Sequence, residues 1–186
     1  TRRPLSKEAI EEVVKKFMGT LHNVYSFFVL YANIDNVNPL EYDMPVADRP
    51  IIDRWIVSVF HNLVRTVREN MDAYQISRAT RAIGIFVDDL SNWYVRRCRD
   101  RYWGAEMDDD KIAAYKTLYE VLVELSKLIS PFIPFMAEEI YQNLVRSIDD
   151  GAPESVHLCD YPVFVPELVD EELEADMAYI RELVVL

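Results

Sequence analysis

The residues best suited to chemistry lie in one short stretch, WYVRRCRDRYW, from Trp93 to Trp103. It combines four arginines with four aromatic side chains in a chain whose net charge is −12. Guanidinium groups bind phosphates and aromatic rings stack on bases, so the stretch could hold an anion, with RNA phosphate as the leading candidate. The alternative is a core helix whose last turns carry cations that favour the helix dipole. The pattern alone supports both interpretations.

Helical periodicity divides these arginines into two sets. Apolar residues recur from Ile76 to Tyr94 with the spacing of one helical face. At about 100° per residue, Arg97 and Arg101 continue that face, and a buried arginine without a partner would be costly. Glu138 and Glu139 are the candidate partners of these two arginines. The predicted structural or interdomain residues are therefore Trp93, Tyr94, Arg97, Arg101, Glu138 and Glu139. The set predicted to point outward and to touch RNA backbone or a base is Arg96, Arg99 and Trp103.

No group of residues predicts catalysis or a metal site. The adjacent carboxylates Glu138 and Glu139 would point about 100° apart on a helix, so they do not form an acid–base pair. The two cysteines and three histidines show neither metal-ligand spacing nor a nucleophile–base pattern. The four glycines form no phosphate-binding loop, and Gly84 is expected to permit a close approach of two helices. We expect no catalytic residue, no metal ligand and reduced cysteines in a cytoplasmic protein.

The elements that must position these residues are predicted to be helices. Amphipathic periodicity, prolines and capping residues define them. The expected helices cover residues 6–31, 48–71, 75–103, 109–129 and 134–147. Such helices with modest loops predict an all-α antiparallel helical bundle over residues 1–147. Residues 148–186 are predicted to form a short extended linker and the start of a C-terminal helical region. The last helix, from near Asp170, ends in an apolar run and is expected to be truncated.

Charge is distributed unevenly along the chain. The net acidity argues against indiscriminate nucleic-acid binding, but residues 48–103 contain more basic than acidic side chains. The second predicted helix carries a partly cationic row that is interpreted as a solvated face. Its members are Arg54, Ser58, His61, Arg65 and Arg68. Charged residues interrupt every apolar segment, so a membrane is not expected as a partner. DNA is not expected as a partner either.

Five segments resemble the isoleucyl-tRNA synthetase family, in the region that follows the catalytic domain. They are Leu21–Asp35, Asp53–Val64, Phe86–Trp103, Leu128–Leu144 and Glu154–Pro162. The motif PFIPFMAEEIY is similar to a signature of the isoleucine, valine and leucine members of the class I synthetases. The motifs SFFVLYANID and SNWYVRRCRDRYW are similar to the isoleucine enzymes. The resemblance covers nearly the whole chain, in order.

This resemblance implies an anticodon-binding domain. The HIGH and KMSKS signatures of class I catalytic domains do not occur in the sequence. The parent enzyme is expected to join isoleucine to its tRNA with ATP and Mg²⁺, whereas this chain alone is expected to be inactive and to need no cofactor. The expected partners are the anticodon stem-loop of the isoleucine tRNA and the catalytic domain of the same polypeptide. The alternatives are the bundle of a valyl or leucyl enzyme and a helical protein-interaction scaffold without an RNA role.

The resemblance also directs attention to the end of the first predicted helix and the loop after it, which face the anticodon in related synthetases. Here short polar groups lie beside an aromatic ring, a combination suited to the edges of unpaired bases. The alternative is that the asparagines only build turns. Together with the outward arginines, the complete predicted RNA-binding set is Tyr31, Asn33, Asp35, Asn36, Asn38, Arg96, Arg99 and Trp103.

Overall fold

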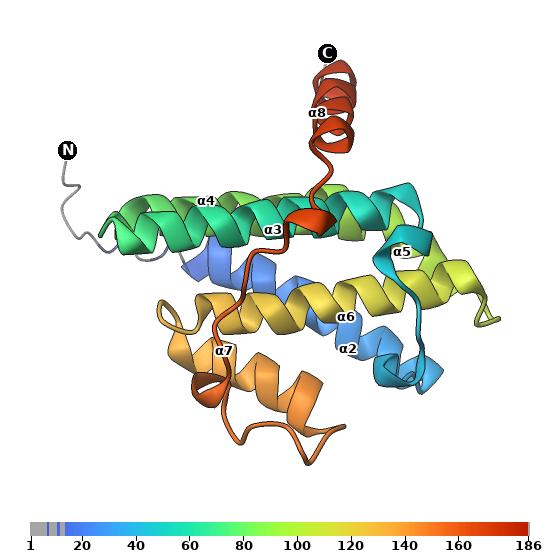
Figure 1. Cartoon of the computed structure of the whole chain (residues 1–186). Helices are drawn as coiled ribbons and strands as arrows, with labels where there is room; N and C mark the ends of the chain where they lie inside the picture. The colour runs from blue at the N-terminus through green and yellow to red at the C-terminus, as the bar shows by residue number, and fades with distance from the viewer. Residues whose placement is uncertain (1–6, 8–10, 12–13, 186) are drawn as a thin grey trace.

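The chain folds into a bundle of helices (Figure 1). The computed structural model describes residues 7, 11 and 14–185, and no strand occurs among them. The all-α prediction is therefore confirmed for the described residues. The predicted start of the first helix at Ser6 lies outside them.

The bundle helices agree closely with the sequence prediction, except that the first one ends at Asp35, four residues later than predicted, so that Asn33 and Asp35 lie in the helix and not in the loop. Short π-helical segments extend three of them, before α2, after α4 and after α7. The elements are η1 (Val14–Met18), α2 (Gly19–Asp35), α3 (Ile51–Asp72), α4 (Ile76–Asp89), η4 (Leu90–Val95), α5 (Arg96–Trp103), α6 (Asp109–Ile129), α7 (Pro134–Tyr141), η5 (Gln142–Arg146) and α8 (Glu171–Val185). Asp108 caps α6 by accepting a hydrogen bond from the Lys111 amide, and Pro134 occupies the first turn of α7.

The π-helical segment η4 changes which arginines point inward. Its wider turn adds one residue to the helical repeat. After it the buried positions are Cys98 and Tyr102, each one residue later than an uninterrupted α-helix predicts. Arg97 is consequently exposed. Its predicted inward position is wrong, because that prediction requires a constant 100° per residue.

Large aromatic residues dominate the core between the helices. Trp55, Tyr94, Tyr102, Tyr115 and Tyr141 are almost completely buried. The loop between α2 and α3 is held against α6 by a buried arginine. Arg49 donates hydrogen bonds to the Glu120 carboxylate at 2.7 Å and to the Thr117 hydroxyl at 3.1 Å.

The segment that follows η5 crosses the bundle and covers the polar row of α3 (Figure 1). The Ser58 hydroxyl accepts a hydrogen bond from the Asp170 amide at 2.8 Å, and Arg68 donates to a carbonyl of the segment at 2.9 Å. His61 Nδ1 accepts from the Val165 amide at 3.4 Å. The row predicted to be a solvated face is therefore in large part a docking surface for the C-terminal segment. The predicted division of the chain after residue 147 stays a prediction.

Helix α8 projects away from the bundle (Figure 1). Its first turn is anchored through Leu173, which is buried, and its C-terminal half through Arg181. The Arg181 guanidinium pairs with the Asp89 carboxylate at 2.5 Å and lies 4.8 Å from the Trp93 ring centroid. Among the described residues, no helix combines the length and apolarity that a membrane crossing requires.

Candidate nucleic-acid interface

Three helix ends meet at one end of the bundle, namely the last turn of α2, the last turn of α5 and the first turn of α6. The Trp103 indole Nε1 donates a hydrogen bond to the Tyr31 hydroxyl at 2.9 Å, across 72 positions in the sequence. The structure therefore joins one member of each predicted RNA-binding group. We call the cluster of Tyr31, Asp35, Trp103 and Lys111 the three-helix junction.

Asp35 is the ionic centre of the three-helix junction. Its carboxylate pairs with the Lys111 ammonium at 2.6 Å and accepts a hydrogen bond from the Tyr115 hydroxyl at 2.5 Å. Burial by itself would raise the pKa of Asp35, but the hydrogen bonds from Lys111 and Tyr115 outweigh it and lower the pKa below its ordinary value. Asp35 is thus an ionised structural group, and its carboxylate is engaged by the protein.

Lys111 is the residue of this cluster that sequence reasoning missed. Its side chain is only 3% exposed, and its ammonium also donates to the Gly104 carbonyl at 2.6 Å. A signal was present in the sequence, because a lysine in the first turn of a helix opposes the helix dipole and needs compensation elsewhere. Lys111 connects the end of α2 to the residue that directly follows Trp103.

The asparagines in the last turn of α2 and in the loop after it divide into two kinds. Asn36 ends α2 in the left-handed conformation with φ 52°, and its backbone N–H donates a hydrogen bond to the Asn33 carbonyl at 3.4 Å. Asn38 caps the 3₁₀ turn η2 (Pro39–Glu41), where its side-chain oxygen accepts from the Leu40 amide at 3.1 Å. Turn building therefore explains Asn38 fully and the backbone of Asn36. The side chains of Asn33 and Asn36 are exposed and face solvent.

Helix α5 presents two of its four arginines on the same side as Trp103. Arg96, Arg99 and Trp103 stand at positions i, i+3 and i+7, which share a helical face. All three are exposed. Two positive charges therefore lie along the helix that ends in the exposed indole, which is an arrangement that can bind a phosphate and a base together.

Arg101 faces the core and pairs with acids that the sequence analysis did not name. It donates to both carboxylate oxygens of Asp53, at 2.8 and 2.7 Å, and to the Asp110 carboxylate at 2.9 Å. Asp53 is 0% exposed and also accepts from the Tyr94 hydroxyl at 2.5 Å. Burial by itself would lower the pKa of Arg101, but the bonds to Asp53 raise it. The predicted pairing with Glu138 or Glu139 is wrong, because those residues lie on another helix, where Glu138 has partners of its own.

Comparison with known proteins decides the family. A model of the anticodon-binding domain of tRNA ligase matches residues 53–186. The chain belongs to this family. It is 52% identical over 172 residues to an isoleucine–tRNA ligase of Clostridium tetani, covering 92% of this chain and 16% of that protein. It is 48% identical to one of Dehalococcoides mccartyi strain CBDB1, covering 97% and 18%, and 47% identical to one of Bacteroides thetaiotaomicron, covering 91% and 15%. The resemblance found in the sequence is confirmed, and the chain spans about a sixth of the length of these relatives.

Two of the other residues predicted to be structural in this anticodon-binding domain, Arg97 and Glu138, contact groups of the protein itself. Arg97 lies 5.1 Å from the Trp93 ring centroid. Glu138 accepts hydrogen bonds from the Ser155 hydroxyl at 2.8 Å and the Val156 amide at 2.9 Å, so it anchors the C-terminal segment on α7. Burial by itself would raise the pKa of Glu138, but these hydrogen bonds and one from a neighbouring amide side chain lower it. Glu139 is exposed.

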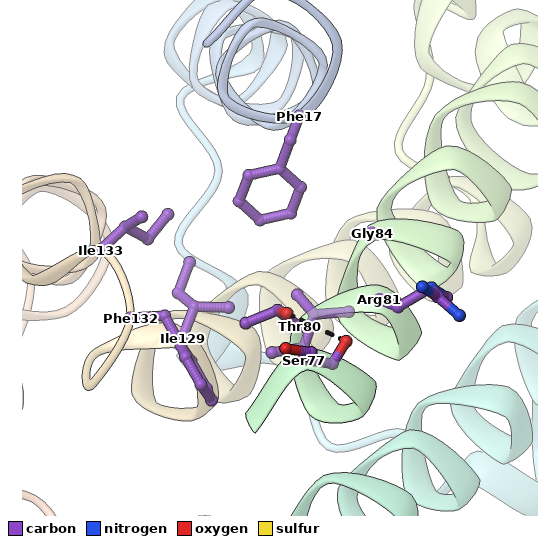
Figure 2. A pocket seen from close by; sticks show the side chains of 9 residues that line it. Phe17, Ser77, Thr80, Arg81, Gly84, Ile129, Phe132 and Ile133 are labelled. Atoms are coloured by element: carbon purple, nitrogen blue, oxygen red, sulfur yellow. Dashed lines mark hydrogen bonds between the residues drawn. The ribbon is translucent and has the colours of Figure 1, made fainter. Parts of the chain in front are cut away.

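The opposite end of the anticodon-binding domain holds an apolar cavity of about 710 Å³ (Figure 2). Phe17 extends over it from η1, and Ile129, Phe132 and Ile133 line it at the turn between α6 and α7. Figure 2 shows the Arg81 guanidinium pointing away from the cavity, so this lining offers shape without a charged group to orient a ligand. We call this region the cavity end. The described residues contain no group of three or more side chains that could hold a metal ion.

Proposed function

We propose that this chain recognises the anticodon stem-loop of the isoleucine tRNA as part of an isoleucine–tRNA ligase. The observation that supports the proposal is the hydrogen bond between Trp103 and Tyr31, because it joins the end of α5, which carries exposed arginines and the exposed indole, to the last turns of α2. The relatives are isoleucine enzymes, which favours this interpretation over a valyl or leucyl one.

The proposed division of labour follows the chemistry of the side chains. Arg96 and Arg99 bind backbone phosphates, which fixes the position of the RNA without reading its sequence. The amides of Asn33 and Asn36 each offer two donors and an acceptor, which suits the edges of unpaired bases in an anticodon loop. Asp35 and Asn38 act as supports of the loop and do not touch RNA.

In the parent enzyme this domain supplies binding and orientation. The joining of isoleucine to tRNA with ATP and Mg²⁺ takes place in the catalytic domain of the same polypeptide, which is the second proposed partner. The chain alone is proposed to be inactive in aminoacylation and to bind no cofactor.

The proposal is tested by titrating the chain with an RNA hairpin that carries the isoleucine anticodon, over a range of salt concentrations. Replacing Arg96 and Arg99 by alanine should weaken binding and lower the slope of log affinity against log salt by about one for each phosphate that the protein no longer neutralises. Arg78→Ala and Arg81→Ala, which remove exposed arginines at the cavity end, are the matched controls and should leave the slope unchanged.

Three results would contradict the proposal. The first is an unchanged salt slope in the Arg96 and Arg99 variants. The second is equal affinity for hairpins with isoleucine and valine anticodons. The third is no binding of any hairpin at low salt, which would favour a protein-interaction scaffold, a role with which the net charge of −12 is compatible.

A further inference from the structure

We propose that Trp103 is a stacking platform for one unpaired base, that Tyr31 is the residue that positions it, and that the platform does not read which base it holds. This inference rests on the proposed function and assigns a specific role to two residues within it. It is carried by the hydrogen bond between the two side chains and by the exposure of the indole.

The indole is exposed but has no free hydrogen-bonding group. Trp103 is 61% exposed, although a large apolar side chain is normally buried. Tryptophan has a single side-chain donor, Nε1–H, and no acceptor. Tyr31 accepts from that donor at 2.9 Å, so the indole presents its π surface and no hydrogen-bonding group to a ligand. A π surface stacks on any base, because every base has a planar face.

The support beneath the indole is rigid. The Tyr31 ring packs against Phe27 at a centroid distance of 4.8 Å and against the buried Tyr102 at 6.0 Å. Tyr102 in turn packs edge-on against Tyr115 at 4.9 Å. These contacts fix the hydroxyl that receives the indole hydrogen bond. An aromatic ring held in this way loses little conformational entropy when a base stacks on it.

The backbone of the platform is held from a second direction. Gly104 ends α5 directly after Trp103, and its carbonyl accepts from the Lys111 ammonium at 2.6 Å. Lys111 is paired with Asp35 at 2.6 Å, so the same ion pair secures the last turn of α2. Trp103 is thus connected to α2 by the indole hydrogen bond, and the backbone next to it is connected to α6 through Lys111. Base identity must be read elsewhere, and the exposed amides of Asn33 and Asn36 are the groups available at the end of α2.

The test uses the whole chain and a hairpin RNA with the isoleucine anticodon, in which 2-aminopurine replaces one loop base at a time. Stacking quenches 2-aminopurine fluorescence, so one loop position should be quenched by the wild-type chain. Trp103→Ala should weaken binding about tenfold and abolish that quenching. Trp103→Phe, which keeps a π surface, should weaken it less than about threefold. Changing the natural base at the stacked position should alter affinity by less than about threefold.

The positioning role of Tyr31 is tested by a double-mutant cycle. Tyr31→Phe removes the hydroxyl and keeps the ring, so it should reduce the quenching in the wild-type background. In the Trp103→Phe background there is no indole donor, and the same change should have no effect. An equal loss in both backgrounds would assign Tyr31 a general structural role and overturn this part of the proposal.

The outcomes separate the platform from the proposed function. If Trp103→Ala leaves hairpin affinity and quenching unchanged while the Arg96 and Arg99 variants weaken binding, the platform is overturned and RNA recognition stands. If affinity depends strongly on the base at the stacked position, the claim that the platform does not read identity is wrong. If the wild-type chain binds no hairpin at low salt, both proposals fail.

Discussion

The two ends of the bundle are built by different interactions. At the three-helix junction, ion pairs and hydrogen bonds from Asp35, Lys111 and Tyr31 connect α2, α5 and α6. At the cavity end, Phe17 and Phe132 belong to an apolar lining that leaves about 710 Å³ unfilled. Charged and hydrogen-bonded contacts fix side-chain directions, whereas apolar contacts are non-directional. The end proposed to bind RNA therefore holds its side chains in defined directions, whereas the cavity end relies on contacts that do not fix direction.

The largest expected effect comes from the buried ion pair beside the three-helix junction. Arg101→Ala should lower the free energy of unfolding by about 3–5 kcal/mol, because it leaves the completely buried Asp53 without its cation. Urea denaturation measures this difference. Arg97→Ala is the matched control, since Arg97 is exposed and its guanidinium lies over the Trp93 ring. Its loss should be about 0.5–1 kcal/mol. Equal effects of the two substitutions would show that the interior network contributes no more than a surface contact.

Lys111 links stability to the proposed binding surface. Lys111→Met removes the partner of Asp35 and the donor to Gly104, and should lower the free energy of unfolding by about 2 kcal/mol. The same variant should bind the isoleucine-anticodon hairpin more weakly, because the backbone after Trp103 is released. Lys116→Met, which breaks a 3.5 Å pair with Glu120 one helical turn away, serves as control with an expected loss of about 0.3–0.5 kcal/mol. If the Lys111→Met variant is folded and its hairpin affinity is unchanged, the ion pair contributes to stability and not to RNA binding.

Sequence reasoning predicts the elements of this fold well and the partners of its charges poorly. The span predicted for α6, residues 109–129, matches the structure because its cap and periodicity are local signals. The predicted placement of Arg97 is wrong because the π-helical turn η4 adds a residue to the helical repeat, and the apolar periodicity used for the prediction does not signal that turn. The pairing of Arg101 with Asp53 joins positions 48 apart, and no local pattern encodes such a distance.

The candidate interface shows the same division between local and tertiary information. The clustering of arginines and aromatic residues in the sequence indicates Trp103 as a candidate RNA-binding residue. The short polar side chains near the end of the first predicted helix indicate Asn33 and Asn36. Neither signal indicates that Tyr31 and Trp103 are hydrogen-bonded to each other, or that Lys111 pairs with Asp35. Those contacts depend on how α2, α5 and α6 are arranged in space. The sequence therefore indicates which groups could bind RNA, and the fold determines which of them are free to do so.

A third prediction concerns the cavity end. The sequence predicts close helix packing at Gly84, but a Cβ atom added there would meet nothing within 4 Å. Gly84→Ala should therefore raise the free energy of unfolding by about 1 kcal/mol, since alanine favours the helix and restricts the unfolded chain. Thermal and urea denaturation both measure the gain, and hairpin affinity should not change. A loss of stability would mean that the cavity end is packed more tightly than its lining indicates.

The smallest effect, and the one specific to the junction, is a dependence on pH. Because hydrogen bonds lower the pKa of Asp35 in the folded chain, its ionised form stabilises the fold. That contribution is fully present above the unfolded pKa of about 3.9 and is lost as the pH falls through the lower folded value. The difference in unfolding free energy between the wild type and Asp35→Asn should accordingly be constant near neutral pH and shrink below about pH 4. The difference produced by Gly84→Ala involves no ionisable group and should stay flat over the same range. A flat profile for Asp35→Asn as well would remove the electrostatic distinction between the two ends.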